Sequence, residues 1–166
     1  SYDDFGRVSS LTTNHDGTPF ATKTYTYKVN ANGKPTNQVS SVTISDAEGH
    51  PYYAYTYTYD QNGNITGISD GTHNTSYAYD SANQLIREDN ELLDVSYTWE
   101  YDASGNIINR GEYGYTTGTL GDVQYDLSYE YTDESWGDLL TFLDGDIFFY
   151  DEIGNPTSYY NGTRWD

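Results

Sequence analysis

A heptapeptide recurs along this chain at the interval of a strand pair. The sequence YDQNGNI at 59–65 returns as YDSANQL at 79–85 and YDASGNI at 101–107, so successive copies begin 20 and 22 residues apart. Outlying copies stand at 2–8 (YDDFGRV) and 150–156 (YDEIGNP). A unit of this size is typical of a hairpin with its turns, which buries apolar side chains only against neighbouring copies. The repeat therefore predicts an array of hairpins and argues against a domain built around one functional pocket.

Less regular copies fill the gaps between these heptapeptides. Each places a glycine in a polar turn after a strand-like run, and they lie at 27–34, 45–50 and 131–139. We expect a single repeat region over residues 1–166, with about eight units of roughly 20 residues. The pattern is looser at 1–50 and 111–145. Residues 113–123 (YGYTTGTLGDV) are rich in Gly and Thr, which favours a longer loop or a bulged hairpin.

Tyrosine occupies every second position before many of the turns. In YAYTYTY at 53–59 four tyrosines alternate with alanine and threonine. A period of two gathers the rings on one face of a strand and cannot gather them on one face of a helix. We expect neighbouring repeats to set these rings beside one another across strands, where an aromatic pair contributes roughly 0.2–1 kcal/mol. The predicted fold class is all-β, with antiparallel β-hairpin repeats forming a twisted, curved sheet.

The composition makes this role of tyrosine necessary. Fewer than a fifth of the residues are Leu, Ile, Val or Phe, and the formal net charge is -19. Those two values together are typical of disordered chains. The 20 tyrosines change that expectation, because their rings bury large areas while their hydroxyls stay in water or find a partner. We therefore expect tyrosine to stand in for an aliphatic core.

The turn chemistry follows from the residues after each tyrosine. Aspartate at the second position of the heptapeptide starts an Asx turn, and glycine three residues later permits a positive φ. Each such segment should reverse the chain. The residues predicted to build the repeat are Tyr59, Asp60, Gly63, Tyr79, Asp80, Tyr101, Asp102, Gly105, Tyr150, Asp151 and Gly154.

The charge and the residue types exclude several partners and sites. Seven Lys and Arg against 26 Asp and Glu leave no means of neutralising phosphates, so we expect no nucleic acid as a partner. No apolar run approaches the roughly 20 residues of a membrane span, and no signal peptide is seen. Cysteine is absent, which rules out disulfides and thiolate metal sites.

No catalytic constellation stands out. Three paired carboxylates are expected by chance among 26 acids, at Asp3 with Asp4, Glu88 with Asp89, and Asp144 with Asp146. No acid stands in an apolar run that would raise its pKa. The three histidines lie far apart in different turns, at His15, His50 and His73. We expect no enzyme, no cofactor and no metal site.

Two binding alternatives remain open. Calcium is one, because Asp60–Asn64 resembles the opening of an oxygen-ligand loop, although the twelfth position, Gly71, lacks the glutamate of an EF-hand. Carbohydrate is the other, because exposed aromatic faces stack on sugar rings. The platforms would be Trp99, Trp136 and Trp165.

These residues carry a resemblance to a known family. YDxxGNI, led by YxYD every 20 or so residues, resembles the YD-repeat or rearrangement-hot-spot (RHS) family, and 148–166 (FFYDEIGNPTSYYNGTRWD) is similar to the last wall repeats of bacterial members. The resemblance implies a β-sheet spiralling into a hollow shell, as in the toxin-complex C proteins and teneurins. It implies as partners the rest of the parent shell and an enclosed C-terminal toxin cargo.

The resemblance also implies where the protein works. Bacterial members suggest a secreted or cell-surface location and a role as a structural segment of a toxin shell. The chain starts within a repeat and lacks the self-cleavage block and toxin tail of the family, which predicts a segment of a longer protein. Edge-to-edge association between copies is a further expectation, because open sheet edges present unpaired backbone groups.

Overall fold

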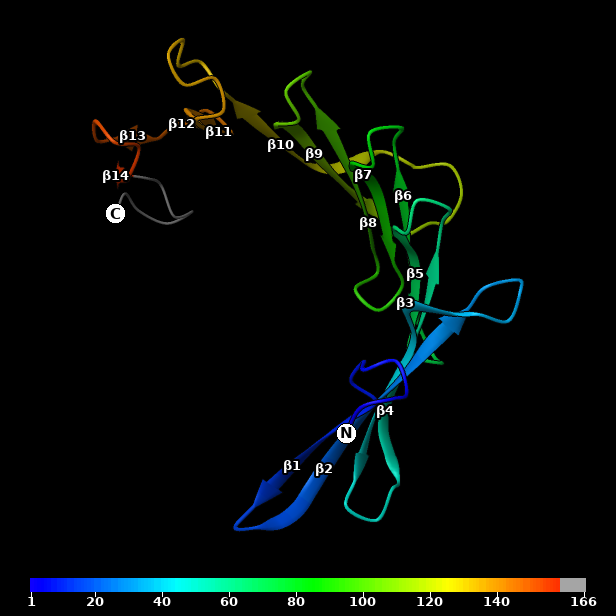
Figure 1. The fold of residues 1–166 in the computed structure, drawn as a ribbon. Helices are drawn as coiled ribbons and strands as arrows, with labels where there is room; N and C mark the ends of the chain where they lie inside the picture. The colour runs from blue at the N-terminus through cyan, green and yellow to red at the C-terminus, as the bar shows by residue number, and fades with distance from the viewer. Residues whose placement is uncertain (159–166) are drawn as a thin grey trace. The chain divides into compact units, whose positions relative to one another are not determined.

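The computed structural model describes residues 1–158, and these form strands and turns without a helix (Figure 1). No segment among them therefore forms a helix able to cross a membrane. The predicted all-β, antiparallel fold is confirmed. The chain divides into two compact units, 1–77 and 78–166, and each is described by itself.

The first unit is a series of antiparallel strands paired in chain order. Hairpins connect each strand to the next, so every strand lies beside its sequence neighbours. Register shifts interrupt most of these ladders, and such β-bulges bend a strand and increase its twist. The strands are β1 (Ser10–His15), β2 (Thr18–Val29), β3 (Pro35–Asp46), β4 (Pro51–Tyr59), β5 (Ile65–Ser69) and β6 (Asn74–Tyr79).

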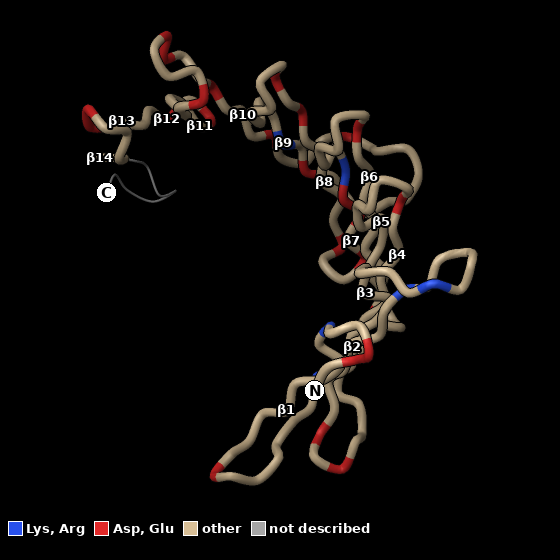
Figure 2. The backbone as a smooth tube through the Cα atoms, in the orientation of Figure 1, with Lys and Arg blue, Asp and Glu red and all other residues tan. Residues whose placement is uncertain are grey.

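The second unit has the same local plan. Its long strands are β7 (Leu85–Asn90), β8 (Val95–Tyr101), β9 (Ile107–Gly114) and β10 (Val123–Glu130). Four short strands follow: β11 (Phe142–Leu143), β12 (Asp146–Ile147), β13 (Phe149–Tyr150) and β14 (Pro156–Ser158). Strands β7 to β12 pair antiparallel in chain order, and β13 pairs with β14. Acidic residues stand at hairpin turns in both units (Figure 2).

Apolar burial is slight in the described residues. Val42 and Val95, each 7 % exposed, are the buried hydrophobic residues there. Val42 on β3 lies opposite Tyr25 of β2 and Tyr55 of β4. The tyrosines thus cover an aliphatic residue from both sides, which is how they replace a thick core.

The tyrosine rings do not face one another across strands in the way predicted. Tyr55 lies opposite Val42 and Tyr57 lies opposite Ile68, so the expectation of ring beside ring across strands is wrong for them. The reason is that each repeat supplies two strands. Tyrosine strands alternate with aliphatic strands and stand roughly 9–10 Å apart, twice the spacing of neighbouring strands. Two ring pairs instead join residues i and i+2 of one strand, Tyr53–Tyr55 at 6.5 Å and Tyr97–Trp99 at 5.9 Å between centroids.

A long loop, residues 115–122, connects β9 to β10 and is tied to the sheet by buried polar groups. Ser96, fully buried, donates its hydroxyl to the Thr116 carbonyl at 3.1 Å and accepts the Thr116 N–H at 3.0 Å. Arg87 donates to the carbonyls of Thr116 and Gly118 and pairs with Asp89, which is 6 % exposed. The loop therefore forms part of the packed unit.

Candidate functional site: the repeated tyrosine–aspartate turn

The turn after each tyrosine is organised by its aspartate. Asp60 Oδ1 accepts the N–H groups of Asn62 and Asn64, both at 2.9 Å, and Oδ2 accepts Asn64 Nδ2 at 2.9 Å. The same three bonds recur around Asp102 and Asp151. Asp80 accepts the corresponding two backbone N–H groups. Both carboxylate oxygens of Asp60 thus accept hydrogen bonds from the turn itself.

The glycines of these turns have the left-handed conformation. Gly63 and Gly105 have φ +93° and Gly154 has φ +84°. In the first of these turns the Gly63 N–H donates to the Asp60 carbonyl, and the strand ladder shifts register beside Tyr59. This arrangement is a type I turn followed by a G1 bulge. Asn83 takes the glycine's place in the turn that begins at Asp80, with φ +64°.

The hydrogen bonds of the turn lower the pKa of its aspartate. At Asp60, Asp102 and Asp151 the largest cause is the side-chain amide of the asparagine four residues later, and backbone N–H groups add to it. The carboxylates are therefore held in the ionised form.

Asp102→Asn is expected to change how stability depends on pH. Because the folded-state pKa of Asp102 is lowered, its stabilising effect is complete above the unfolded value, about 3.9, and is lost as pH falls through the folded value. Thermal unfolding across acid and neutral pH should show a constant gap in Tm between wild type and variant above about pH 5 that closes below about pH 4. Asp122→Asn, at an exposed loop position, should show no such gap. A gap for Asp102→Asn that persists in acid would contradict this role.

The hydroxyl of the tyrosine that precedes a turn donates a hydrogen bond to the preceding repeat. The Tyr101 hydroxyl donates to the Leu85 carbonyl at 2.8 Å, and Tyr59 donates to the Val39 carbonyl at 2.7 Å. Equivalent bonds join Tyr27 to Val8, Tyr131 to Ile107 and Tyr150 to Leu140. We name these bonds the tyrosine seam. Tyr79 stands at the end of β6, directly before the turn at Asp80.

Burial raises the pKa of the phenols at Tyr59, Tyr101, Tyr131 and Tyr150. The neutral, hydrogen-bond-donating form is therefore favoured in the folded protein. The stabilisation from the seam is complete below about pH 10, the ordinary pKa of tyrosine, and is lost as pH rises through the higher folded values.

Tyr101→Phe should destabilise the second unit by about 1 kcal/mol, because it removes a hydrogen bond and leaves the Leu85 carbonyl without this donor. Urea unfolding followed by circular dichroism measures the loss. Tyr125→Phe is the matched control, because the Tyr125 side chain is nearly half exposed and should cost little. Equal losses for the two variants would argue against a structural role for the seam.

Side chains of one repeat also cover the glycine of the next turn. A β-carbon built on Gly105 would lie 3.3 Å from Gln84 Nε2, and one built on Gly63 would lie 3.5 Å from Gln38 Nε2. At Gly154 the covering group is the Trp136 indole, and a β-carbon there would lie only 2.6 Å from it. Side chains of one repeat therefore pack against the turn of the next repeat within each unit. Both the positive φ and the limited space favour glycine at these positions.

His50 and His73 lie in separate turns, His15 is the last residue of β1, and each histidine lies near an aspartate. His50 Nδ1 lies 3.0 Å from Asp46 Oδ2, and His73 Nδ1 lies 3.4 Å from Asp70 Oδ2. His15 lies 3.6 Å from Asp16 on the surface. The structure also brings ligand atoms of Asp46, Glu48 and His50 within 4.8 Å of one another. This group was not predicted from the sequence, although its residues stand at i, i+2 and i+4 in DAEGH at 46–50.

The paired carboxylates of the sequence lie in turns and in strands of both units. Asp3 holds its own turn together with Arg7. Glu88 and Asp89 are consecutive in β7 and point to opposite faces of the sheet. Asp144 lies in the β11–β12 turn with φ +51°, before Asp146 of β12.

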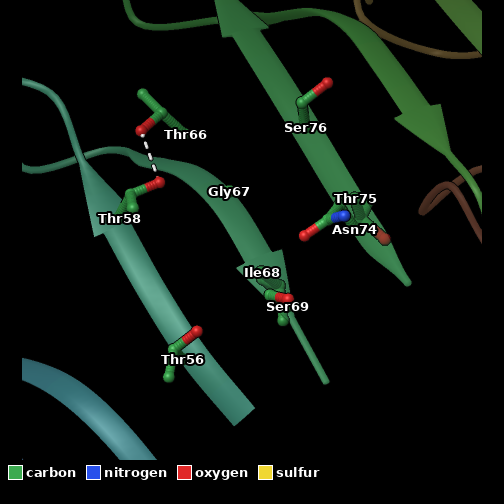
Figure 3. Close-up of a pocket in the computed structure, with 9 residues that line it drawn as sticks. All are labelled: Thr56, Thr58, Thr66, Gly67, Ile68, Ser69, Asn74, Thr75 and Ser76. Atoms are coloured by element: carbon green, nitrogen blue, oxygen red, sulfur yellow. Dashed lines mark hydrogen bonds between the residues drawn. The ribbon is translucent and has the colours of Figure 1, made fainter. Parts of the chain in front are cut away.

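The opposite face of β4 carries small hydroxyl side chains in place of rings. With β5 and β6 it surrounds a shallow hollow of about 260 Å³ (Figure 3). Thr58 and Thr66 are hydrogen-bonded there at 3.0 Å, and Gly67 of β5 lies between Thr58 of β4 and Ser76 of β6. The lining contains no acid, base or histidine, so the hollow offers no group for proton transfer at neutral pH.

The tryptophans differ in exposure. Trp99 lies in β8 with its ring close to Tyr97. Trp136 lies in the turn before β11 and is 47 % exposed. Trp165 lies outside the described residues. Of the two predicted sugar platforms among the described residues, Trp136 is the more exposed.

Comparison with known proteins identifies the fold. No protein-family profile matches the sequence, and no curated protein matches it. The structure is similar to the Tc holotoxin pore of Photorhabdus luminescens, with TM-score 0.61, 13 % identity and 100 % of this chain aligned to 10 % of that one. It is similar to TcdB2–TccC3, with TM-score 0.62, 14 % identity and 100 % of this chain aligned to 10 % of that one. The chain thus spans about a tenth of these neighbours, and the likeness is one of fold.

Proposed function

We propose that this chain is a wall segment of an encapsulating β-shell of the RHS/YD-repeat type. The observation that carries the proposal is the tyrosine seam: within each unit, hydroxyls of one repeat bind carbonyls of the repeat before it. Such bonds fix each hairpin to its neighbour and need no second layer of structure. The scarcity of buried apolar side chains among residues 1–158 agrees with a wall, because a wall needs no thick core.

The likeness to the Tc toxin structures supports this function at the level of fold. The partners we propose are the remainder of the parent shell and a C-terminal cargo enclosed by it. A secreted or cell-surface bacterial toxin would be the natural setting. The segment itself would perform no catalysis and would need no cofactor.

Protease protection of the longer chain that carries this segment tests the proposal. A wall should shield the region C-terminal to it from proteinase K. Gly63→Val combined with Gly105→Val should expose that region, because both turns lose their left-handed residue. Ser104→Val, in the same turn as Gly105, should leave protection intact. A C-terminal region that is cut equally in wild type, variant and control would refute encapsulation.

A carbohydrate-binding function is the alternative, and the exposed ring of Trp136 is the observation that favours it. Tryptophan fluorescence titrated with peptidoglycan fragments separates the two. Saturable quenching that disappears in Trp136→Phe would support a glycan-binding module. Tryptophan emission that does not change with the fragments would favour the role as a wall segment.

A further inference from the structure

The repeat departs from its own pattern at Trp136. The glycines of the two other turns are covered by glutamine amides, from Gln38 and Gln84, whereas Gly154 is covered by an indole. A glutamine therefore suffices to cover a turn glycine. The indole packs over Gly154 with part of its surface and leaves 47 % of the residue exposed. An aromatic face that is exposed beside a hollow can contact a ligand there.

Trp136 borders a hollow between two consecutive turns of the second unit. The hollow measures about 420 Å³, and the residues that line it include the aromatic residues Trp136, Phe149 and Tyr150 and the acids Asp133, Asp151 and Glu152. Phe149 is 52 % exposed. The hollow thus combines accessible aromatic rings with three acids.

The walls of this hollow are held in place without a ligand. Asp133 Oδ1 accepts the N–H groups of Ser135 and Trp136, both at 2.8 Å. Asp151 is fixed in its turn by the bonds described above. Preformed walls reduce the entropic cost of binding.

The acidic and aromatic residues that line the hollow favour a cation as its ligand. No Lys or Arg is among the described residues that line the hollow. Two of the three lining hydroxyls already donate within the protein, Tyr150 to the Leu140 carbonyl and Thr141 to the Glu130 carbonyl, and the third belongs to Ser135. The carboxylates attract positive charge, and aromatic faces attract cations through their quadrupole. A sugar, which needs both donors and acceptors, fits this lining less well.

We propose that the hollow beside Trp136 binds an alkylammonium group, such as the head group of choline or the side chain of lysine. The positive charge would lie among the carboxylates of Asp133, Asp151 and Glu152. The alkyl groups would contact Trp136 and Phe149. This site would be independent of the wall function.

Titration with choline tests the site by the indole N–H resonance of Trp136, in a background of Trp99→Phe and Trp165→Phe. We expect a saturable shift for choline and roughly three- to tenfold weaker binding of its uncharged carbon isostere, dimethylbutanol, given the usual size of cation–π attraction. Binding should weaken as salt is raised. Equal binding of choline and the isostere would overturn the proposal, as would the absence of a saturable shift.

Two acidic residues provide a matched pair of variants. Glu152→Gln should weaken choline binding several-fold, because it removes a lining carboxylate. Glu134→Gln removes an exposed carboxylate that does not line the hollow and should leave binding unchanged. Equal effects would count against this location of the site.

Parallel titrations identify the source of the ammonium group. Choline and a short peptide with one lysine are compared, and the tighter ligand indicates a free head group or a protein side chain. N-acetylglucosamine is titrated alongside them. A shift produced by the sugar and not by either ammonium ligand would refute the proposal in favour of glycan binding.

Discussion

Arg87→Met is expected to lower the free energy of unfolding of the second unit by about 3–5 kcal/mol, the usual cost of removing one partner of a buried ion pair. Arg87 Nε lies 2.8 Å from Asp89 Oδ1, and the Asp89 side chain is 8 % exposed. The same guanidinium donates to the carbonyls of Thr116 and Gly118. The variant therefore removes the cation beside a buried carboxylate and one of the two side chains that hold the loop at 115–122, the other being Ser96. Urea unfolding followed by the fluorescence of Trp99 measures the change.

Arg110→Met is the control for this variant. Arg110 lies 3.7 Å from Glu112, and both side chains are about a third exposed. A partly exposed pair with this separation contributes about 1 kcal/mol or less, and the contact of Arg110 with the Tyr97 ring, 5.2 Å from its centroid, adds about 0.5–1 kcal/mol. Should Arg87→Met prevent folding altogether, the double variant Arg87→Met with Asp89→Leu should recover folding, because it removes both charges. Equal losses for Arg87→Met and Arg110→Met would contradict the assigned role of the buried pair.

Gly105→Val is expected to destabilise the second unit by about 1–3 kcal/mol through backbone strain alone. Gly105 has φ +93°, a conformation that a β-branched residue rarely adopts. A β-carbon there would also lie 3.3 Å from Gln84 Nε2, so the covering side chain must shift. Ser104→Val, at the exposed neighbouring position, should change stability by about 0.5 kcal/mol or less. Thermal and urea unfolding of the two variants gives the comparison.

The chain contains an internal reference for this prediction. Asn83 occupies the position equivalent to Gly105 in the preceding turn, with φ +64°. Asparagine tolerates the left-handed region better than other residues with a side chain. Gly105→Asn should therefore lose less stability than Gly105→Val. If Ser104→Val, Gly105→Asn and Gly105→Val have equal free energies of unfolding, backbone strain does not determine the stability of this turn.

Local features of the fold were predictable because their signals lie within a few residues. The alternation in 53–59 predicted a strand, and β4 spans Pro51–Tyr59. The pattern of aspartate followed by glycine predicted chain reversal, and the bonds around Asp102 run to residues two and four positions later. Interactions of such short range depend on side-chain chemistry and backbone preference, both of which the sequence displays.

Contacts between repeats could not be predicted in the same way. We expected ring beside ring, but Tyr57 faces Ile68, because an aliphatic strand separates the tyrosine strands. The Tyr101 hydroxyl finds a carbonyl 16 residues away. The Trp136 indole covers Gly154 where other repeats use glutamine. Each of these contacts depends on strand pairing and register, which a period of two leaves undetermined.

The residue pattern alone predicted hairpins, the turns that follow the tyrosine–aspartate pairs, and tyrosine in place of an aliphatic core. Tertiary structure alone decided what the tyrosines touch, how the loop at 115–122 is held by Arg87 and Ser96, and where rings and carboxylates meet around a hollow. The difference lies in the sequence separation of the interacting groups. A turn is stabilised by groups a few residues apart, whereas the bonds of the tyrosine seam can form only after the strands have paired.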